Sequence, residues 1–214
     1  MERSLQPELL DSLAPDDPAA LHNRRDLRLI NRFIGTVPWF ARELARRLRP
    51  GERVLEIGAG TGELTGALAA RGVPIDGLDL WPRPVDLPRS SAWHRADLRT
   101  FGGYAEYPVV IGNLILHQFS ERELAELGRR LAPVRVVLAS EPARVRRAQV
   151  FLAVGAWVFR GNHVTRHDAQ VSVRAGFLKA ELPGYLGLSR ADWRWTCGVQ
   201  GIGTYRMMAE KRGD

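Results

Sequence analysis

The chain has 214 residues, of which 45% are hydrophobic and 26% are charged, which is the balance of one globular domain. This composition excludes intrinsic disorder, collagen and coiled coil as descriptions of the whole chain. The formal net charge is +7, but the arginines that carry it lie in scattered pairs and not in one run. We therefore do not expect a nucleic acid as the substrate.

The sequence gives no sign of export or membrane insertion. The only cysteine, Cys197, excludes an internal disulfide and a cysteine-based zinc site. The first 20 residues lack the basic start and apolar centre of a signal peptide. The longest apolar run, residues 150–159, is about half as long as a membrane-spanning helix. These features predict a cytoplasmic protein without a transmembrane segment.

Hydrophobic spacing predicts the elements in chain order. Residues 1–20 are acidic and contain prolines, which predicts a loose leader. Apolar side chains then recur at helical spacing over residues 21–34 and 36–48, so that residues 1–50 form a leader and a helical cap. The main domain covers residues 51–214, with strands expected at residues 53–57, 73–80, 92–96, 109–116 and 134–139 and helices at residues 63–71, 120–131 and 145–159.

The order of these elements predicts the fold. Strands alternate with helices from residue 53 to residue 159, which is typical of a parallel sheet with helices on both faces. Residues 190–209 instead alternate with period two around a glycine-containing turn, which predicts a terminal hairpin. Residues 143–190 are expected to form an insert that covers the substrate. We therefore predict a Rossmann-like α/β fold, a mostly parallel seven-stranded sheet with an antiparallel C-terminal strand.

A glycine-rich turn follows the first strand, in the stretch Val54-Leu-Glu-Ile-Gly-Ala-Gly-Thr-Gly62. Such a turn lets the backbone approach a ligand, and the next helix offers free N–H groups to a polar or anionic group. Asp79 ends the second strand, where an acid can accept hydrogen bonds from both ribose hydroxyls of a nucleoside. Asp76 is the alternative if the strand ends one turn earlier. The pattern G-x-G-x-G differs from the G-x-G-x-x-G of dinucleotide folds.

In these residues the chain resembles the class I S-adenosylmethionine-dependent methyltransferases, over about residues 50–139. The resemblance implies S-adenosyl-L-methionine as the cofactor, with its ribose on Asp79 and its adenine near Asp97. It also implies that Asn113-Leu-Ile-Leu-His-Gln-Phe119 is the family's segment after strand four. Pro108 departs from the family, in which an aspartate often opens that strand, and we expect it to affect only the strand's entry. The cofactor-binding residues so implied are Glu56, Gly58, Ala59, Gly60, Gly62, Asp79, Leu80, Asp97, Leu98 and Asn113.

A narrower resemblance bears on the acceptor. The stretches Arg166-His-Asp-Ala-Gln-Val-Ser-Val-Arg174 and Leu29-Ile-Asn-Arg-Phe33 are similar to those of bacterial members that act on small phenol- or quinone-like substrates. This similarity implies a small, largely apolar acceptor and favours an aromatic hydroxyl.

A hydroxyl acceptor needs a base to take its proton. His117 follows the fourth strand at the carboxyl edge of the sheet, where ligands bind in such folds. His167 stands beside Asp168, which can orient its ring. Both histidines are candidate catalytic bases, and for each the alternative is a purely structural hydrogen bond. Trp157 and Arg174 are candidate substrate contacts, with packing and loop anchoring as their alternatives. No pair of histidines has the spacing of a metal site.

Two rival functions stay open. An RNA or protein methyltransferase is supported by the positive charge and predicts an arginine-rich face beside the cofactor. The motif Asn-Pro-Pro-Tyr, typical of methylation on base amino groups, is absent, because Gly112-Asn-Leu-Ile stands after strand four. The second rival is a non-catalytic binding module, which predicts cofactor binding without an acceptor pocket. The identity of the acceptor and the formation of a homodimer are left open.

Overall fold

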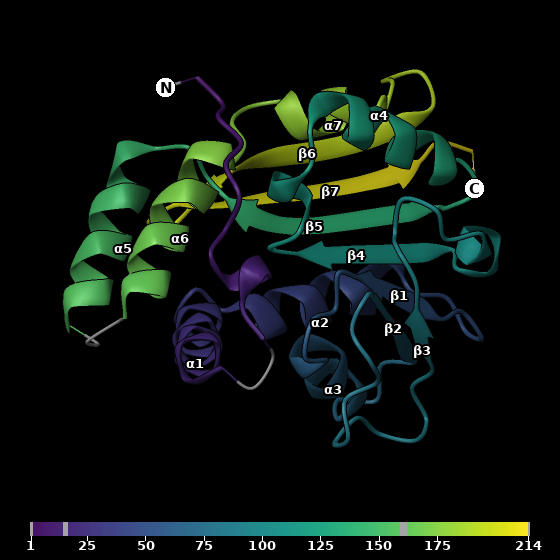
Figure 1. Ribbon diagram of the computed structural model, residues 1–214. Helices are drawn as coiled ribbons and strands as arrows, with labels where there is room; N and C mark the ends of the chain where they lie inside the picture. The colour runs from purple at the N-terminus through teal and green to yellow at the C-terminus, as the bar shows by residue number, and fades with distance from the viewer. Residues whose placement is uncertain (1, 15–16, 159–161, 214) are drawn as a thin grey trace.

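The computed structural model describes residues 2–14, 17–158 and 162–213, without the side chains of residues 11 and 153–158 (Figure 1). Seven strands form one sheet in the order β3-β2-β1-β4-β5-β7-β6. The first five strands run parallel, and β7 runs antiparallel to both of its neighbours. The predicted α/β fold, with its antiparallel C-terminal strands, is confirmed.

The strands are β1 Val54–Ile57, β2 Ile75–Asp79, β3 Trp93–Arg95, β4 Val109–Asn113, β5 Val136–Pro142, β6 Trp193–Gln200 and β7 Thr204–Lys211. The helices are α1 Pro18–Phe33, α2 Thr36–Arg47, α3 Glu63–Ala69, α4 Glu121–Arg130, α5 Arg146–Val158, α6 His163–Ala175 and α7 Glu181–Tyr185. Three short 3-10 turns are η1 Leu10–Ser12, η2 Gly103–Glu106 and η3 Leu116–Gln118.

The sheet separates two hydrophobic cores. On one face, side chains of α2 and α3, such as Phe40 and Leu68, pack against the strands. On the other face, α4 and α7 cover the sheet through side chains such as Leu124 and Leu182. Burying each of these side chains contributes about 1.5–3 kcal/mol. Because both faces are covered, the central strand β4 is apolar on both sides, as the sequence predicted.

Three helices gather at one end of the sheet, beyond the carboxyl ends of the parallel strands (Figure 1). Helix α6 packs against both α5 and α1. None of the described helices is long and apolar enough to cross a lipid bilayer. The carboxyl edge of the sheet, where ligands bind in folds of this type, therefore faces α1, α6 and the chain's first residues.

Some elements differ from the sequence prediction. Strand β4 ends at Asn113 and not near residue 116, because Leu114 adopts a φ of 56° and the chain turns into η3. The part of the expected insert around His167, for which no secondary structure was predicted, is helix α6. Its N-cap Asn162 accepts the backbone N–H of Thr165 at 2.9 Å, which starts the helix. Helix α7 was not predicted.

The first residues also differ from the loose leader that was expected. Residues 3–10, called the strap below, cross from α6 to η3. The guanidinium of Arg3 donates to the carbonyls of Ala175 and Phe119, both at 2.8 Å, and of His117 at 3.1 Å. The backbone N–H of Ser4 donates to the carbonyl of Arg174 at 3.1 Å. The division into a cap of residues 1–50 and a main domain stays a prediction.

Candidate active site

A cavity of about 580 Å³ lies at the carboxyl ends of β1, β2 and β4. Helix α1 borders it through Arg24, Leu27 and Asn31, and the strap reaches it through Leu10. Nine of the ten residues expected at the cofactor line this cavity, namely Glu56, Gly58, Ala59, Gly60, Asp79, Leu80, Asp97, Leu98 and Asn113. The tenth, Gly62, is the N-cap of α3 with a φ of 72°.

Gly58 brings the glycine turn against the segment that follows β4. Its φ is 63°, and a Cβ at this position would lie 2.3 Å from Cγ1 of Ile115. Only glycine allows both this backbone conformation and this close approach. At Gly60, by contrast, an added Cβ would meet no atom within 4 Å, because the turn borders open space there.

Asp79 fixes the glycine turn to the end of β2. One carboxylate oxygen accepts the backbone N–H of Gly60 at 2.7 Å, and the other accepts that of Trp81 at 3.0 Å. The acid is thus held in place beside the turn while it lines the cavity. The guanidinium carbon of Arg24 lies over the ring of Trp81, 5.1 Å from the ring centroid. Helix α1 and the loop after β2 therefore meet at the border of this cavity.

Glu56 is a buried carboxyl at the floor of the cavity, 3% exposed. The hydroxyl of Thr65 donates a hydrogen bond to it. Burial raises the pKa of Glu56 to about 8, and the nearby charge of Asp79 adds to this effect. Glu56 therefore carries a proton at neutral pH.

Asp97 and Asn113 complete the carboxyl edge. Arg99 binds the Asp97 carboxylate with its Nε, at 3.1 Å and 3.0 Å from the two oxygens, and this hydrogen bonding lowers the pKa of Asp97. Asn113 makes a long contact of 3.5 Å from its Nδ2 to Oδ1 of Asn31. Its own Oδ1 is buried and has no hydrogen-bond partner among the described residues. A buried acceptor of this kind favours a ligand that donates a hydrogen bond.

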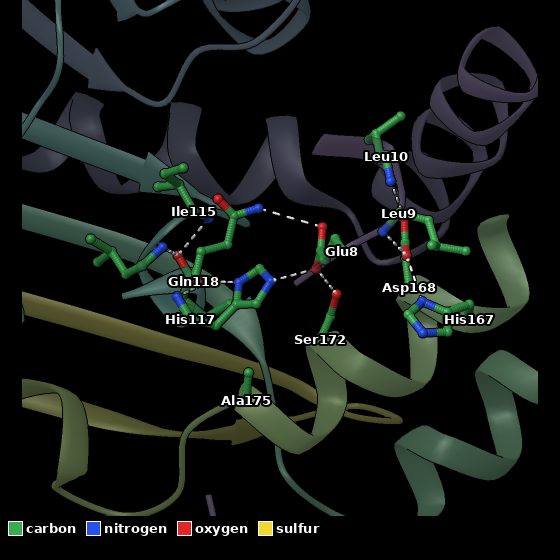
Figure 2. A network of polar contacts seen from close by, with 12 residues as sticks. Glu8, Leu9, Leu10, Ile115, His117, Gln118, His167, Asp168, Ser172 and Ala175 are labelled. Carbon is green, nitrogen blue, oxygen red and sulfur yellow. Dashed lines mark hydrogen bonds and ion pairs between the residues drawn. The ribbon is translucent and has the colours of Figure 1, made fainter. Parts of the chain in front are cut away.

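His117 lies outside this cavity, in a network of carboxylates (Figure 2). Its Nδ1 lies 2.7 Å from Oε2 of Glu141 on β5, and its Nε2 lies 3.2 Å from Oε1 of Glu8 in the strap. Burial alone would lower the pKa of His117, but the hydrogen bonds to the two carboxylates outweigh it and raise the pKa to about 9. At neutral pH the ring therefore holds a proton on each nitrogen and donates both.

The structure separates the two candidate bases. His167 stands on α6 with 43% of its side chain exposed, and its Nδ1 lies 3.0 Å from Oδ1 of Asp168. Asp168 also accepts the backbone N–H groups of Leu9 and Leu10, at 2.8 Å and 3.0 Å, and so holds the strap (Figure 2). His167 is not among the described residues that line the cavity of about 580 Å³.

Of the two candidate substrate contacts, only Arg174 has a side chain in the described part of the structure. Arg174 is exposed in the last turn of α6, and it lines neither cavity there. The side chain of Trp157 lies outside the described part of the structure. Both roles stay predictions.

Three residues of the site were missed in the sequence. Glu141 is the last residue but one of β5, is fully buried, and accepts the backbone N–H groups of Ile115 and Leu116 at 3.2 Å and 2.9 Å. Its position in Ala139-Ser-Glu-Pro142, at the carboxyl end of an apolar strand, was the available sign. Asn31 and Glu8 carry no such sign, because they reach the site through the packing of α1 and the strap.

Residues 29–171 match a protein family described as a methyltransferase domain. The chain belongs to this family of methyltransferases. The prediction of an enzyme that uses S-adenosylmethionine is therefore confirmed at the level of the family. No curated protein matches the chain.

Solved structures of methyltransferases share the fold at low sequence identity. The plantazolicin methyltransferase BpumL, in complex with S-adenosylhomocysteine, is 13% identical over 92% of each chain, with a TM-score of 0.67. The plantazolicin methyltransferase BamL is 10% identical over 94% of this chain and 92% of its own, with a TM-score of 0.71. Magnesium protoporphyrin IX methyltransferase from Synechocystis PCC 6803 is 19% identical over 95% and 91%, with a TM-score of 0.57.

Proposed function

We propose that this methyltransferase transfers a methyl group from S-adenosylmethionine to a small, largely apolar acceptor, with an aromatic hydroxyl as the favoured class. The observation that carries the cofactor part is the cavity of about 580 Å³ at the sheet's carboxyl edge, where the glycine turn, Asp79 and Asp97 meet. S-adenosylmethionine supplies a methyl group on a positively charged sulfur, open to in-line displacement. The protein's task is then chiefly to align the acceptor and to handle its proton.

The residues present fit this cofactor. Asp79 offers two carboxylate oxygens at the border of the cavity, suited to a pair of ribose hydroxyls. The unpartnered Oδ1 of Asn113 suits the ammonium of the methionine moiety, which donates hydrogen bonds. The open space beside Gly60 allows the close approach of a ligand to the backbone.

The roles of the histidines follow from their proton states. With its pKa near 9, His117 is a hydrogen-bond donor at neutral pH, and it must first lose a proton to act as a base. In this arrangement its role is to position Glu8. His167, which the described structure keeps away from the cavity, would need a movement of α6 or of the acceptor to serve as a base.

An RNA or protein acceptor is the alternative, and the charges of the cavity speak against RNA. Among the described residues, two arginines line the cavity, Arg24 and Arg99. Five carboxyl residues line it as well, namely Glu56, Glu63, Asp79, Asp97 and Glu123. Even without Glu56, which is protonated at neutral pH, the carboxyl residues outnumber the arginines four to two, so such a border would repel a phosphate backbone. The surplus of arginine in the sequence is thus not gathered at the proposed site.

Replacing Asp79 tests the proposal that this cavity binds the cofactor. Asp79→Ala removes the acceptor for the ribose hydroxyls, and hydrogen bonds to a charged group contribute about 1.5–3 kcal/mol. We expect the affinity for S-adenosylhomocysteine, measured by calorimetry, to fall at least about tenfold. Asp86→Ala, which removes an exposed carboxylate from the next loop, is the matched control and should leave the affinity unchanged. Equal affinities of the two variants would refute the assignment of Asp79.

A further inference from the structure

A second cavity, of about 290 Å³, lies under the strap. The strap encloses it with Leu5, Gln6, Pro7 and Glu8, η3 contributes His117 and Gln118, and α6 contributes Val171 and Ala175. Half of its lining residues are thus apolar, and Glu8 and His117 make one charged corner. Its volume is near the lower end of the range for small-molecule pockets, about 300–1,000 Å³.

The charged corner is rigidly built. Glu141 is fully buried and accepts hydrogen bonds both from Nδ1 of the His117 ring and from the backbone N–H of Leu116 in η3. The ring in turn directs its Nε2 at Oε1 of Glu8, and the Ser172 hydroxyl on α6 donates to the same oxygen. The Glu8 carboxylate is therefore fixed by groups from η3 and α6, and its side chain is only 11% exposed (Figure 2).

One oxygen of Glu8 has room for a further donor. Its Oε2 accepts only a long contact from Nε2 of Gln118, at 3.4 Å, among the described residues. A carboxylate oxygen can accept about two hydrogen bonds. Gln118 lines both cavities, so this oxygen contacts a residue that the cavity under the strap shares with the cavity at the sheet's carboxyl edge.

We propose that the cavity under the strap is the acceptor pocket, and that Oε2 of Glu8 accepts the hydrogen bond of a neutral acceptor's aromatic hydroxyl. This inference rests on the proposed function and names the place and the polar anchor of its acceptor. The free position at this corner is an oxygen of the Glu8 carboxylate, which accepts hydrogen bonds and repels a second carboxylate, so an anionic acceptor is disfavoured. A ligand that lacks a hydroxyl donor leaves Oε2 of Glu8 poorly satisfied.

Three naphthalene derivatives test the predicted selectivity. 2-Naphthol carries the hydroxyl donor, 2-methoxynaphthalene has a similar shape without the donor, and 2-naphthoate is an anion. Binding is measured by calorimetry on the full-length protein saturated with S-adenosylhomocysteine. We expect 2-naphthol to bind at least about tenfold more tightly than either of the other two. Neither of them can donate a hydrogen bond to the charged Glu8 carboxylate. Failure of 2-naphthol to bind the saturated protein, or equal binding of the three, would overturn the inference.

Two pairs of variants locate the pocket. Val171→Trp fills the cavity from α6 and should weaken 2-naphthol binding more than tenfold, while Gln170→Trp, on the exposed side of the same helix, should leave it unchanged. Glu8→Gln keeps the size of the side chain, removes its charge and should bring the ratio of 2-naphthol to 2-methoxynaphthalene affinities close to one. Glu2→Gln, on an exposed residue just before the strap, should keep that ratio. A role of Glu8 in strap packing alone would not change this ratio.

The same titrations separate the two proposals. If wild-type protein does not bind S-adenosylhomocysteine, the proposed function fails. If it binds S-adenosylhomocysteine, and both Val171→Trp and Glu8→Gln bind 2-naphthol with the wild-type affinity and selectivity, the pocket is misplaced and the cofactor assignment stands. Glu8→Gln keeps the test decisive if Val171→Trp does not fold, because Glu8 lies in the strap and outside both hydrophobic cores.

Discussion

Two acidic side chains line the cofactor cavity in opposite states of ionisation. Burial keeps Glu56 protonated at neutral pH, whereas hydrogen bonding to Arg99 keeps Asp97 charged. The sequence places both carboxyls near the ends of strands but does not distinguish their environments. The difference arises from the fold, which buries one and gives the other an arginine partner.

The state of Glu56 makes stability depend on pH. Its pKa in the folded protein is about 8, against 4.5 ordinarily, so the folded state binds more protons than the unfolded state between these values. The free energy of unfolding therefore falls as pH rises through this window, by up to about 1.4 kcal/mol per pH unit from this group. Glu56→Gln removes this dependence.

Thermal unfolding of wild type and Glu56→Gln between pH 5 and pH 9 measures this effect. We expect the stability of the variant relative to wild type to rise with pH up to about pH 8 and then to level off. Glu126→Gln, at a half-exposed position of α4, controls for the loss of one carboxyl group. A constant difference between Glu56→Gln and wild type across the window would show that Glu56 is ionised in the folded state.

At the scale of elements, the strap links parts of the chain that are distant in sequence. It ties α6 to the segment after β4 through Arg3, Glu8 and the backbone of Leu9 and Leu10. Its sequence looks like a leader because it is short, polar and broken by proline, with no periodicity to indicate packing. Its order comes from partners more than a hundred residues away, which a local pattern cannot reveal.

Loss of the Asp168 carboxylate should loosen the strap. Asp168→Ala removes the carboxylate that accepts the backbone N–H groups of Leu9 and Leu10. Hydrogen bonds to a charged group typically contribute about 1.5–3 kcal/mol to stability. Amide hydrogen exchange at Leu9 and Leu10 should become about tenfold faster, while exchange in β4 and β5 stays as in wild type. Gln170→Ala on the same helix should change neither. Unaltered protection at both amides would mean that the strap is held elsewhere.

The difference between local pattern and contacts distant in sequence explains which elements the sequence predicted. Strands β1, β4 and β5 are short, mostly apolar runs with glycine or proline near their ends, so their positions followed from pattern. Helix α6 has polar and apolar residues mixed around His167, and it is stabilised by its Asn162 cap and by packing on α1 and α5. Tertiary contacts of this kind override weak local preference.

For the whole molecule, the sequence placed most of the residues expected at the cofactor around one cavity, but it did not place the residues of the proposed acceptor side. The residues expected at the cofactor follow neighbouring strands of one sheet, so the topology alone brings Gly58, Asp79 and Asn113 to one edge. The acceptor side combines the strap, η3 and α6, whose relative placement depends on side-chain packing. A cytoplasmic location and a homodimer stay predictions.

The central claim is that the cavity at the carboxyl edge of the sheet binds S-adenosylmethionine. Calorimetric titration of the purified protein with S-adenosylmethionine and S-adenosylhomocysteine tests it most directly, with NAD as the control ligand. The account predicts saturable one-to-one binding of the first two and none of NAD, because the turn has the spacing G-x-G-x-G and the cavity is bordered by Asp79 and Asp97. Binding of NAD with equal affinity, or of none of the three, would contradict it.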